Sequence, residues 1–270
     1  MYQRVPFETG ALEALALREV NGLERWDKGS SGRWQCELEV LTPLCVKSSF
    51  EQQHRQRAKG AVIPGSSLRG MVRNAAEALG AGCGRFYGGG RELPAELSPC
   101  NERTACLVCR VFGFVEGKQG CQSRVRFTDA ATPTAIWRQL QADGRRGEGG
   151  EAERETGWAV FPHRTGQIPD GRIPCVMPPT KFVFRVEYQS LDAMELAVFR
   201  LAVTLQAGED ALVHKLGFSK SQGLGSCRVR IGKGDEIADA VRREALERET
   251  RRYANMNGFR ELVRWRTEKR

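Results

Sequence analysis

Four cysteines in the middle of the sequence have a spacing that suits a metal ion. Cys100, Cys106 and Cys109 form a C-x5-C-x2-C pattern, and Cys83 precedes them in a glycine-rich stretch. Four thiolates can complete the tetrahedral shell of Zn²⁺, and a C-x2-C pair supplies two of them from one tight turn. Such a shell leaves no evident open position, so the expected ion is structural and not catalytic.

Two alternatives to this ligand set stay open. Cys121 could replace Cys83 as the fourth ligand, or the four residues could be ordinary thiols without a metal. A metal is favoured because a glycine-rich stretch without a core-forming period needs another source of order.

The cellular compartment also bears on the cysteines. The N-terminus, MYQRVPFETGALEAL, lacks the basic start and apolar run of a signal peptide, and no stretch approaches the roughly 18 apolar residues of a membrane span. We therefore expect a soluble cytoplasmic protein that has no membrane partner. All nine cysteines are expected to stay reduced there, so a cluster indicates metal binding before disulfides.

A second group of residues suits a phosphate backbone. The stretch 215–231 contains Gly217, Gly223 and Gly225, which let backbone N–H groups approach a ligand closely. The side chains that offer donors to phosphate oxygens are Lys215, Ser219, Lys220, Ser221 and Gln222. The GxxxxGK[ST] pattern of a nucleotide-binding P-loop is missing. The alternative is a flexible turn before an edge strand. Net charge agrees with an acidic polymer as partner, since 42 lysines and arginines face 33 acidic residues.

The stretch RVFGFVEG (110–117) nearly fits the aromatic signature of an RNA-recognition motif. It departs from that signature at Val111 and Gly117, and the first predicted strand offers no second aromatic platform. We therefore interpret Phe112 and Phe114 as packing beneath the cysteine pair.

These groups must be positioned by a small set of elements. Alternating apolar residues predict strands at 34–45, 123–130, 181–188 and 226–231, and a period near 3.6 predicts helices that begin at residues 64–67 and 191. A serine, Ser66 or Ser67, is expected at the N-cap of the first helix, with Arg69 and Arg73 on its polar face. The order β-α-β-β-α-β predicts an α+β, ferredoxin-like fold.

We expect one domain over residues 1–270, with additions to this fold. The additions are a cysteine-rich insertion (80–121), a long charged insertion without a sustained period (131–180), and a charged C-terminal tail with a helical pattern (235–270). A basic, polar loop (46–60) lies between the first strand and the first helix.

Three short motifs, in this order, resemble the RAMP superfamily, specifically the RNA-binding backbone subunits of type III and related class 1 CRISPR effector complexes. They are IPGSSLRG (63–70), CLVCRVFG (106–113) and SKSQGLG (219–225), and with the strand order the resemblance covers about residues 34–231.

The resemblance implies a modified RNA-recognition fold that polymerises along guide RNA (crRNA). Insertion 131–180 resembles the thumb that wedges between guide–target base pairs, and loop 46–60 would face the target strand. The implied partners are guide RNA, target RNA, copies of the chain itself and other effector subunits of an antiviral ribonucleoprotein. The implied RNA-binding residues are Lys47, Arg55, Arg57, Lys59, Ser66, Ser67, Arg69, Arg73, Lys215, Phe218, Ser219, Lys220, Ser221, Gln222, Gly223 and Gly225.

Loop 46–60 departs from the pattern of the RNA-cleaving members, which carry a catalytic aspartate there. No aspartate lies between Cys45 and Pro64, so we expect a non-catalytic subunit that holds RNA for another protein to act upon. The alternative is a target-RNA endoribonuclease that uses Glu51 and His54, the latter as general base. A guide-processing nuclease of the same superfamily is a weaker alternative, because the cysteine insertion and the PGSSLRG motif argue against it.

Overall fold

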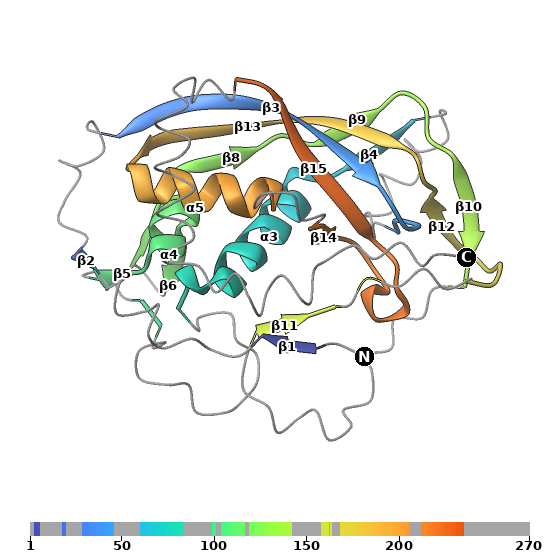
Figure 1. Ribbon diagram of the computed structural model, residues 1–270, viewed down its shortest axis with the longest axis horizontal. Helices are drawn as coiled ribbons and strands as arrows, with labels where there is room; N and C mark the ends of the chain where they lie inside the picture. The colour runs from blue at the N-terminus through green and yellow to red at the C-terminus, as the bar shows by residue number, and fades with distance from the viewer. Residues whose placement is uncertain are drawn as a thin grey trace.

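The computed structural model describes residues 3–5, 18–19, 29–45, 60–83, 99–100, 104–116, 119–141, 158–161, 163, 168–205 and 212–234. Its centre is a seven-stranded antiparallel sheet in the order β14-β15-β3-β13-β9-β4, in which β8 also pairs with β13 (Figure 1). The bounds are β14 (His214–Lys215), β15 (Ser226–Lys233), β3 (Ser30–Val40), β13 (Lys181–Leu191), β9 (Ala130–Thr132), β4 (Ala61–Ile63) and β8 (Val125–Phe127).

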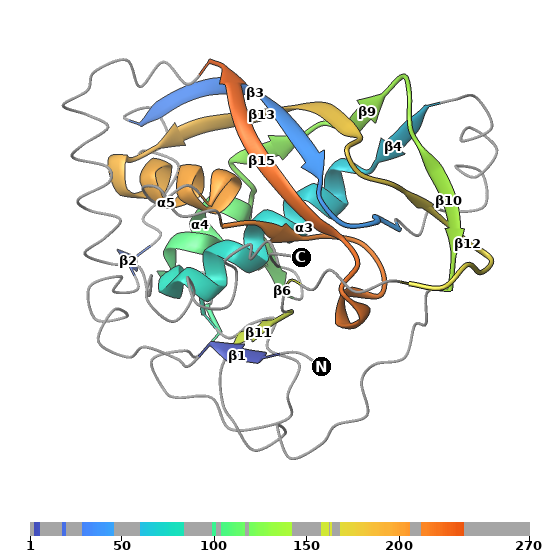
Figure 2. The same ribbon diagram turned by 45° about the vertical axis from the view of Figure 1, so that its right-hand side comes forward.

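The predicted fold class is confirmed by this strand order. β15, β3, β13 and β8 correspond to the fourth, first, third and second predicted strands, as in a split βαβ fold. Helices α3 (Gly65–Ala76) and α5 (Ala193–Thr204) both lie on one face of the sheet (Figures 1 and 2), and a π-helical turn, η2 (Glu77–Ala81), extends α3. None of the described helices lies on the other face of the sheet, which we call the open face.

The core forms between the sheet and these helices. On β3 the alternate residues from Trp34 to Val40 are buried, and on β13 those from Phe182 to Val186. Trp34 stacks on Phe199 of α5, with ring centroids 5.4 Å apart. The period-2 pattern of the strands therefore sets which face of the sheet takes the helices.

The start of α3 differs from the prediction. Pro64 occupies the N-cap and no side chain of the helix caps it; Asp129 Oδ1 instead accepts a hydrogen bond from the Gly65 N–H at 2.8 Å. A Cβ on Gly65 would lie 2.4 Å from the carbonyl oxygen of Phe127. The close approach of helix and strand thus requires glycine, and a carboxylate from the neighbouring strand end replaces the serine cap.

The described residues of insertion 131–180 include regular strands that its sequence does not predict. β10 (Trp137–Leu140) pairs with β12 (Ile173–Val176) to form a two-stranded arm, and β11 (Trp158–Val160) pairs with β1 (Gln3–Val5). A backbone bridge between Leu44 and Val176 joins the arm to the end of β3.

The prediction that all nine cysteines stay reduced is wrong for one pair. Cys45 and Cys175, neighbours of that bridge, form a disulfide with their Cα atoms 4.4 Å apart. Sequence spacing could not reveal this pair, because 130 residues separate its members.

The cysteine-rich insertion packs under α3 and α5. It contains β5 (Thr104–Ala105), which pairs with β2 (Arg18–Glu19), helix α4 (Leu107–Phe112), and a hairpin of β6 (Phe114–Glu116) and β7 (Gln119–Cys121). The tail 235–270 and residues 46–59 of the basic loop lie outside the described residues. Among the helices that are described, none is long and apolar enough to cross a membrane.

Buried His214 gives the fold a testable pH dependence. Its Nε2 lies 3.0 Å from the carbonyl oxygen of Val203, which can only accept, so the neutral ring carries its proton on Nε2. Burial lowers the pKa of His214 from 6.5 to about 4. His214 therefore binds a proton near pH 6.5 in the unfolded chain but only near pH 4 in the folded chain. The free energy of unfolding falls as the pH drops from 6.5 to 4.

We expect the free energy of unfolding of the wild type to fall by about 2 kcal/mol more than that of a His214→Gln variant between pH 7 and pH 5. The glutamine amide can still donate to Val203, so the variant changes the titration with little change in packing. Urea unfolding at the two pH values measures the difference. An equal loss in both proteins would contradict the assignment.

Candidate metal centre and glycine-rich loop

The four predicted metal ligands come together in the structure. The Sγ atoms of Cys83, Cys100, Cys106 and Cys109 all lie within 4.8 Å of one another, and all four residues are buried. The Sγ atoms of Cys83 and Cys109 are 3.7 Å apart. A tetrahedral zinc with Zn–S bonds of about 2.3 Å requires sulfur atoms about 3.8 Å apart, so the cluster fits this ion.

The fourth member of the cluster is Cys83 and not Cys121. Cys121 is only half-buried on β7 and lies outside the cluster. Cys83 lies two residues after η2, so the helix formed by α3 and η2 positions the first ligand of the cysteine cluster.

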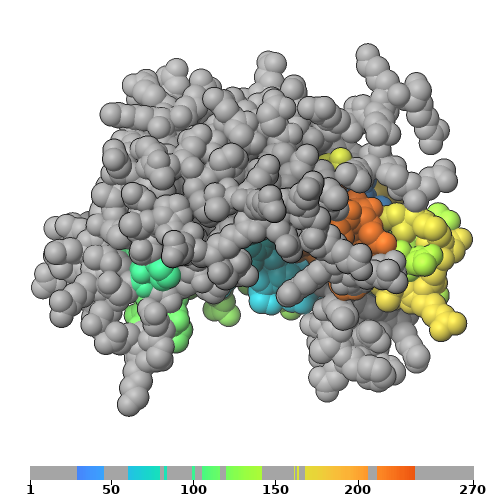
Figure 3. Space-filling model, turned by 90° about the horizontal axis from the view of Figure 1, so that it is seen from below, coloured from blue at the N-terminus to red at the C-terminus, as the bar shows by residue number. Residues whose placement is uncertain are grey.

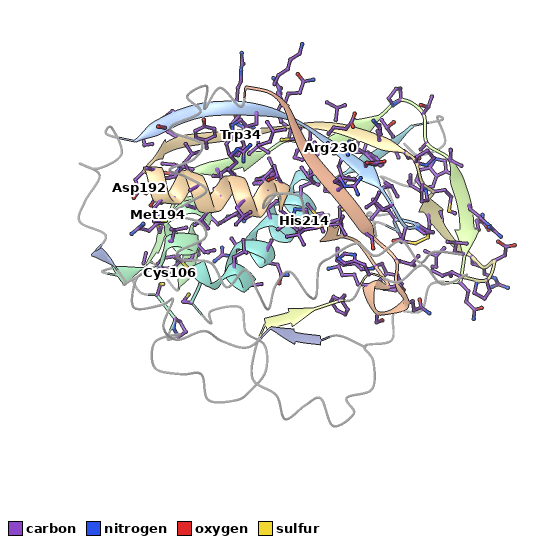
Figure 4. All side chains as sticks on the ribbon, in the orientation of Figure 1. Trp34, Cys106, Asp192, Met194, His214 and Arg230 are labelled. Atoms are coloured by element: carbon purple, nitrogen blue, oxygen red, sulfur yellow. A yellow bond between two sulfur atoms is a disulfide. The ribbon has the colours of Figure 1, made fainter. Side chains whose placement is uncertain are left out.

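Helix α4 supplies the second pair of ligands from its first turn. Cys106 is the N-cap, and its Sγ accepts a hydrogen bond from the Cys109 N–H at 3.4 Å. The Cys106 N–H in turn donates to Cys100 Sγ at 3.0 Å, and the Cys83 N–H donates to Cys106 Sγ at 3.4 Å. Backbone N–H groups thus stabilise negative charge on the sulfur atoms. Figure 4 shows Cys106 below Asp192, at the start of α5.

Hydrogen bonds among the four thiols shift their pKa values in opposite directions. Hydrogen bonding, first with Cys100, lowers the pKa of Cys83, and hydrogen bonding with Cys106 lowers that of Cys100. Hydrogen bonding to Cys100 raises the pKa of Cys106 and of Cys109. A bound Zn²⁺ would replace the remaining protons, because coordinating thiols are deprotonated.

Arg73 supports the cluster from inside the protein, so the prediction that it faces outward is wrong. Its guanidinium donates to Glu77 Oε1 at 2.9 Å, to the Gly113 carbonyl at 2.8 Å and to Cys109 Sγ at 3.7 Å. Arg69, half-buried on the same helix, donates to the Phe112 carbonyl, and its pKa is lowered by burial and by the charge of Arg73. Both arginines thereby hold the C-terminal end of α4.

A buried ionic network joins the insertion to α5. Glu195 Oε1 accepts from Arg110 Nε at 2.8 Å and also pairs with Arg124. Although Arg124 directly precedes buried Val125 of β8, its own side chain also turns inward, and it donates to the carbonyls of Arg110 and Ser190. Burial opposes ionisation of Glu195, but the hydrogen bond from Arg124 and the charges of Arg124 and Arg110 hold its pKa below the usual value.

The near-match to an RNA-recognition motif is part of the core. Phe112 and Phe114 are both buried, and Phe112 meets Phe199 edge-on with ring centroids 5.8 Å apart. Both rings belong to the hydrophobic core that also contains Cys106 and Cys109, and neither ring is placed to stack on a base.

The glycine-rich loop, residues 215–225, is hydrogen-bonded to the end of β3. Thr42 Oγ1 donates to the Gly223 carbonyl at 2.9 Å, and the N–H groups of Gly225 and Phe218 donate to the carbonyls of Pro43 and Cys45. Gly225 has φ +78°, and a Cβ there would lie 1.7 Å from the Leu216 carbonyl oxygen. A glycine is therefore required at this position.

The predicted donors of this loop divide into structural and accessible groups. The Lys215 ammonium donates to the carbonyls of Gly223 and Leu224 at 2.8 and 3.1 Å, so it braces the loop. Ser219 is buried with φ 56°. Lys220 is partly exposed, lies 5.8 Å from the centre of the Phe161 ring, and has a pKa lowered by burial. The partly exposed residues Phe218, Ser221 and Gln222 surround it.

The metal cluster and the glycine-rich loop lie in different parts of the molecule. In Figures 1 and 2 helix α4 lies on the opposite side from the loop, which adjoins the arm. Viewed from below, the orange surface of the loop borders the yellow surface of the arm (Figure 3), and Phe218 and Leu224 pack with Leu140 of β10 and with the Cys45–Cys175 pair. Of the remaining predicted RNA contacts, Ser66 is exposed and Ser67 partly exposed at the start of α3.

Several predicted residues cannot be placed, and two important ones were missed. Outside the described residues lie Lys47, Glu51, His54, Arg55, Arg57 and Lys59.

Two residues that the sequence analysis did not predict, Thr42 and Glu195, are important in the structure. The spacing Asp192-x-x-Glu195 is a capping-box signature that could have revealed Glu195, and the structure contains that box. Nothing local singles out Thr42.

Comparison with known proteins assigns the family. No curated protein matches the chain. Among solved structures, the chain is similar to Thermofilum pendens Csc2, with 15% sequence identity and a TM-score of 0.43. The match covers 91% of this chain and 85% of that chain. Because this likeness is weak, the fold assignment rests on the strand order. The family model of the RAMP superfamily matches residues 37–228, a span that runs from β3 to β15 and contains both the metal cluster and the glycine-rich loop. The chain belongs to the RAMP superfamily.

Proposed function

We propose that this chain is a non-catalytic backbone subunit of a class 1 CRISPR effector complex. It binds guide RNA, positions the guide–target duplex and assembles in the cytoplasm with copies of itself and with other effector subunits. Membership of the RAMP superfamily supports this proposal, and all three motifs that resemble the backbone subunits lie within the matched span 37–228.

The observation that carries the proposal is the rigid glycine-rich loop beside the arm. The side chains of Thr42 and Lys215 both donate to the Gly223 carbonyl, so hydrogen bonds within the chain hold the loop in this shape. Lys220 and its polar neighbours remain partly exposed on this ordered backbone. A pre-ordered loop with a lysine and small polar residues suits the phosphates of RNA, because little conformational entropy is lost on binding.

A structural Zn²⁺ completes the proposal. The ion would be held by Cys83, Cys100, Cys106 and Cys109. It would cross-link η2 to α4 and supply no chemistry on RNA.

Insertion 131–180 is proposed to act as the thumb, and the two-stranded arm would form the base of this thumb. Glu51 and His54 lie outside the described residues, so the endoribonuclease alternative stays a prediction.

Lys220→Ala is expected to weaken the affinity for unstructured RNA about tenfold, because a charge-assisted contact to phosphate is lost, and to do so equally for different sequences. Fluorescence anisotropy with two RNAs of unrelated sequence measures this. Lys181→Ala is the matched control, since Lys181 is exposed and paired with Glu37 on the open face of the sheet. Arg69→Ala is a poorer test because it also breaks the contact with Phe112.

Equal affinities of Lys220→Ala and Lys181→Ala would contradict the role of the loop. A difference confined to one RNA sequence would contradict backbone recognition.

A further inference from the structure

The open face of the sheet carries four basic side chains that the described residues do not neutralise. We call Arg33, Arg126, Arg185 and Lys233 the basic patch. All four are exposed, and within the described part of the chain none of their side chains makes a hydrogen bond or an ion pair. They come from four different strands, β3, β8, β13 and β15, so the fold and not a local charge run brings them together.

The strand register shows that these side chains share one surface. Arg126 and Arg33 both lie opposite Glu187, one on each side of β13. In the next row Arg185 lies opposite Gln35, and Gln35 lies opposite Lys233. Partners in register project to the same face, and strands are about 4.8 Å apart, so the patch spans four strands in two adjacent rows.

The other end of the same face is built differently. There Lys181 pairs with Glu37 at 2.9 Å, and Glu39 lies 3.3 Å from Arg228 and 4.0 Å from Arg230. Figure 4 shows Arg230 on β15. Basic residues are therefore compensated at one end of the face, whereas the basic patch surrounds only one carboxylate of the described residues, Glu187.

The basic patch concentrates like charge on neighbouring strands of the sheet. Like charges on neighbouring strands repel one another, and a concentrated positive field attracts anions from solution. Three of the four side chains are arginines, whose planar donors match the oxygens of a phosphate. The described side chains on this face of β3, β8, β13 and β15 include no aromatic ring, so it offers no platform for stacking bases.

We propose that the basic patch binds the phosphodiester backbone of single-stranded RNA without sequence preference, as a second RNA site. This site is separate from α3, which covers the opposite face of the sheet, and from the glycine-rich loop. The inference rests on the proposed function only in taking RNA as the ligand of the chain.

The test compares two triple variants with the same loss of charge. The patch variant is Arg33→Ala, Arg126→Ala and Arg185→Ala; the control is Lys181→Ala, Arg228→Ala and Arg230→Ala at the compensated end. RNA affinity is measured over a series of salt concentrations. The patch variant should weaken binding at least about tenfold and reduce the slope of log K against log salt by about 2, because each lost phosphate contact removes about 0.7. The control should stay within about threefold of wild type.

Equal losses in both variants would overturn the proposal, because they would reflect net charge alone. Unchanged RNA affinity in the patch variant, with loss of an effector subunit from the purified complex, would assign the patch to an acidic protein partner and also overturn it. If the wild type binds no RNA, the proposed function fails. If the wild type binds RNA and Lys220→Ala weakens it but the patch variant does not, only this inference fails.

Discussion

Cys109→Ser is expected to abolish stoichiometric zinc binding and to lower the free energy of unfolding by several kcal/mol. Structural zinc sites in small domains contribute about 10–16 kcal/mol of apparent binding energy, and part of that energy is folding energy here. Loss of the Cys109 sulfur also removes one of the three acceptors of Arg73, the one that links the cluster to α3. Zinc content per chain and urea unfolding measure the two effects.

Cys121→Ser is the matched control, because Cys121 lies on the same insertion but outside the cluster. It should keep one zinc per chain and the stability of the wild type. Chelation of zinc from the wild type should reproduce the effect of Cys109→Ser. A wild-type protein that is folded, cooperative and free of zinc would contradict the metal site.

Glu195→Gln is expected to destabilise the fold by about 3–5 kcal/mol, because it leaves the guanidinium groups of Arg110 and Arg124 inside the protein without their shared carboxylate. Glutamine can still serve in the capping box with Asp192, so the substitution removes the charge and spares the helix cap. Urea unfolding at neutral pH measures the loss.

The lowered pKa of Glu195 makes the stability that this ionic network contributes depend on pH. A carboxylate with a lowered pKa contributes stability above its unfolded value of 4.5, and this contribution is lost as the pH falls below that value. The difference between wild type and Glu195→Gln should therefore shrink in acid. Glu187→Gln, on the open face, should change stability by less than about 0.5 kcal/mol. Equal stability of Glu195→Gln and Glu187→Gln would show that the network is not structural.

The strands and the metal cluster could be predicted because local patterns determine them. Alternation in β3 and β13 follows directly from burying one face of a sheet, and ligand spacing in 100–109 follows from the shape of a zinc turn. The fourth ligand could not be chosen from spacing alone, since Cys83 and Cys121 flank the motif at similar distances. The path of η2 decides between them.

The arginines show where local patterns fail. Arg73 and Arg124 occupy positions that look polar and outward by periodicity, yet each is drawn inward by partners far away in sequence, at Cys109 and Gly113 for the first and at Glu195 for the second. The Cys45–Cys175 pair and the contact of Thr42 with Gly223 depend equally on tertiary contacts. Positive charge alone therefore did not distinguish side chains that support the fold from those that remain exposed to a ligand.

The proposed function requires that the chain binds RNA through the RNA phosphates. The most direct test is the affinity of the wild-type protein for an unstructured RNA at about 50 and about 200 mM salt. We expect tight binding at low salt, an affinity at least about tenfold weaker at high salt, and the same values for RNAs of unrelated sequence. Absence of binding at low salt, or an affinity that does not change with salt, would contradict it.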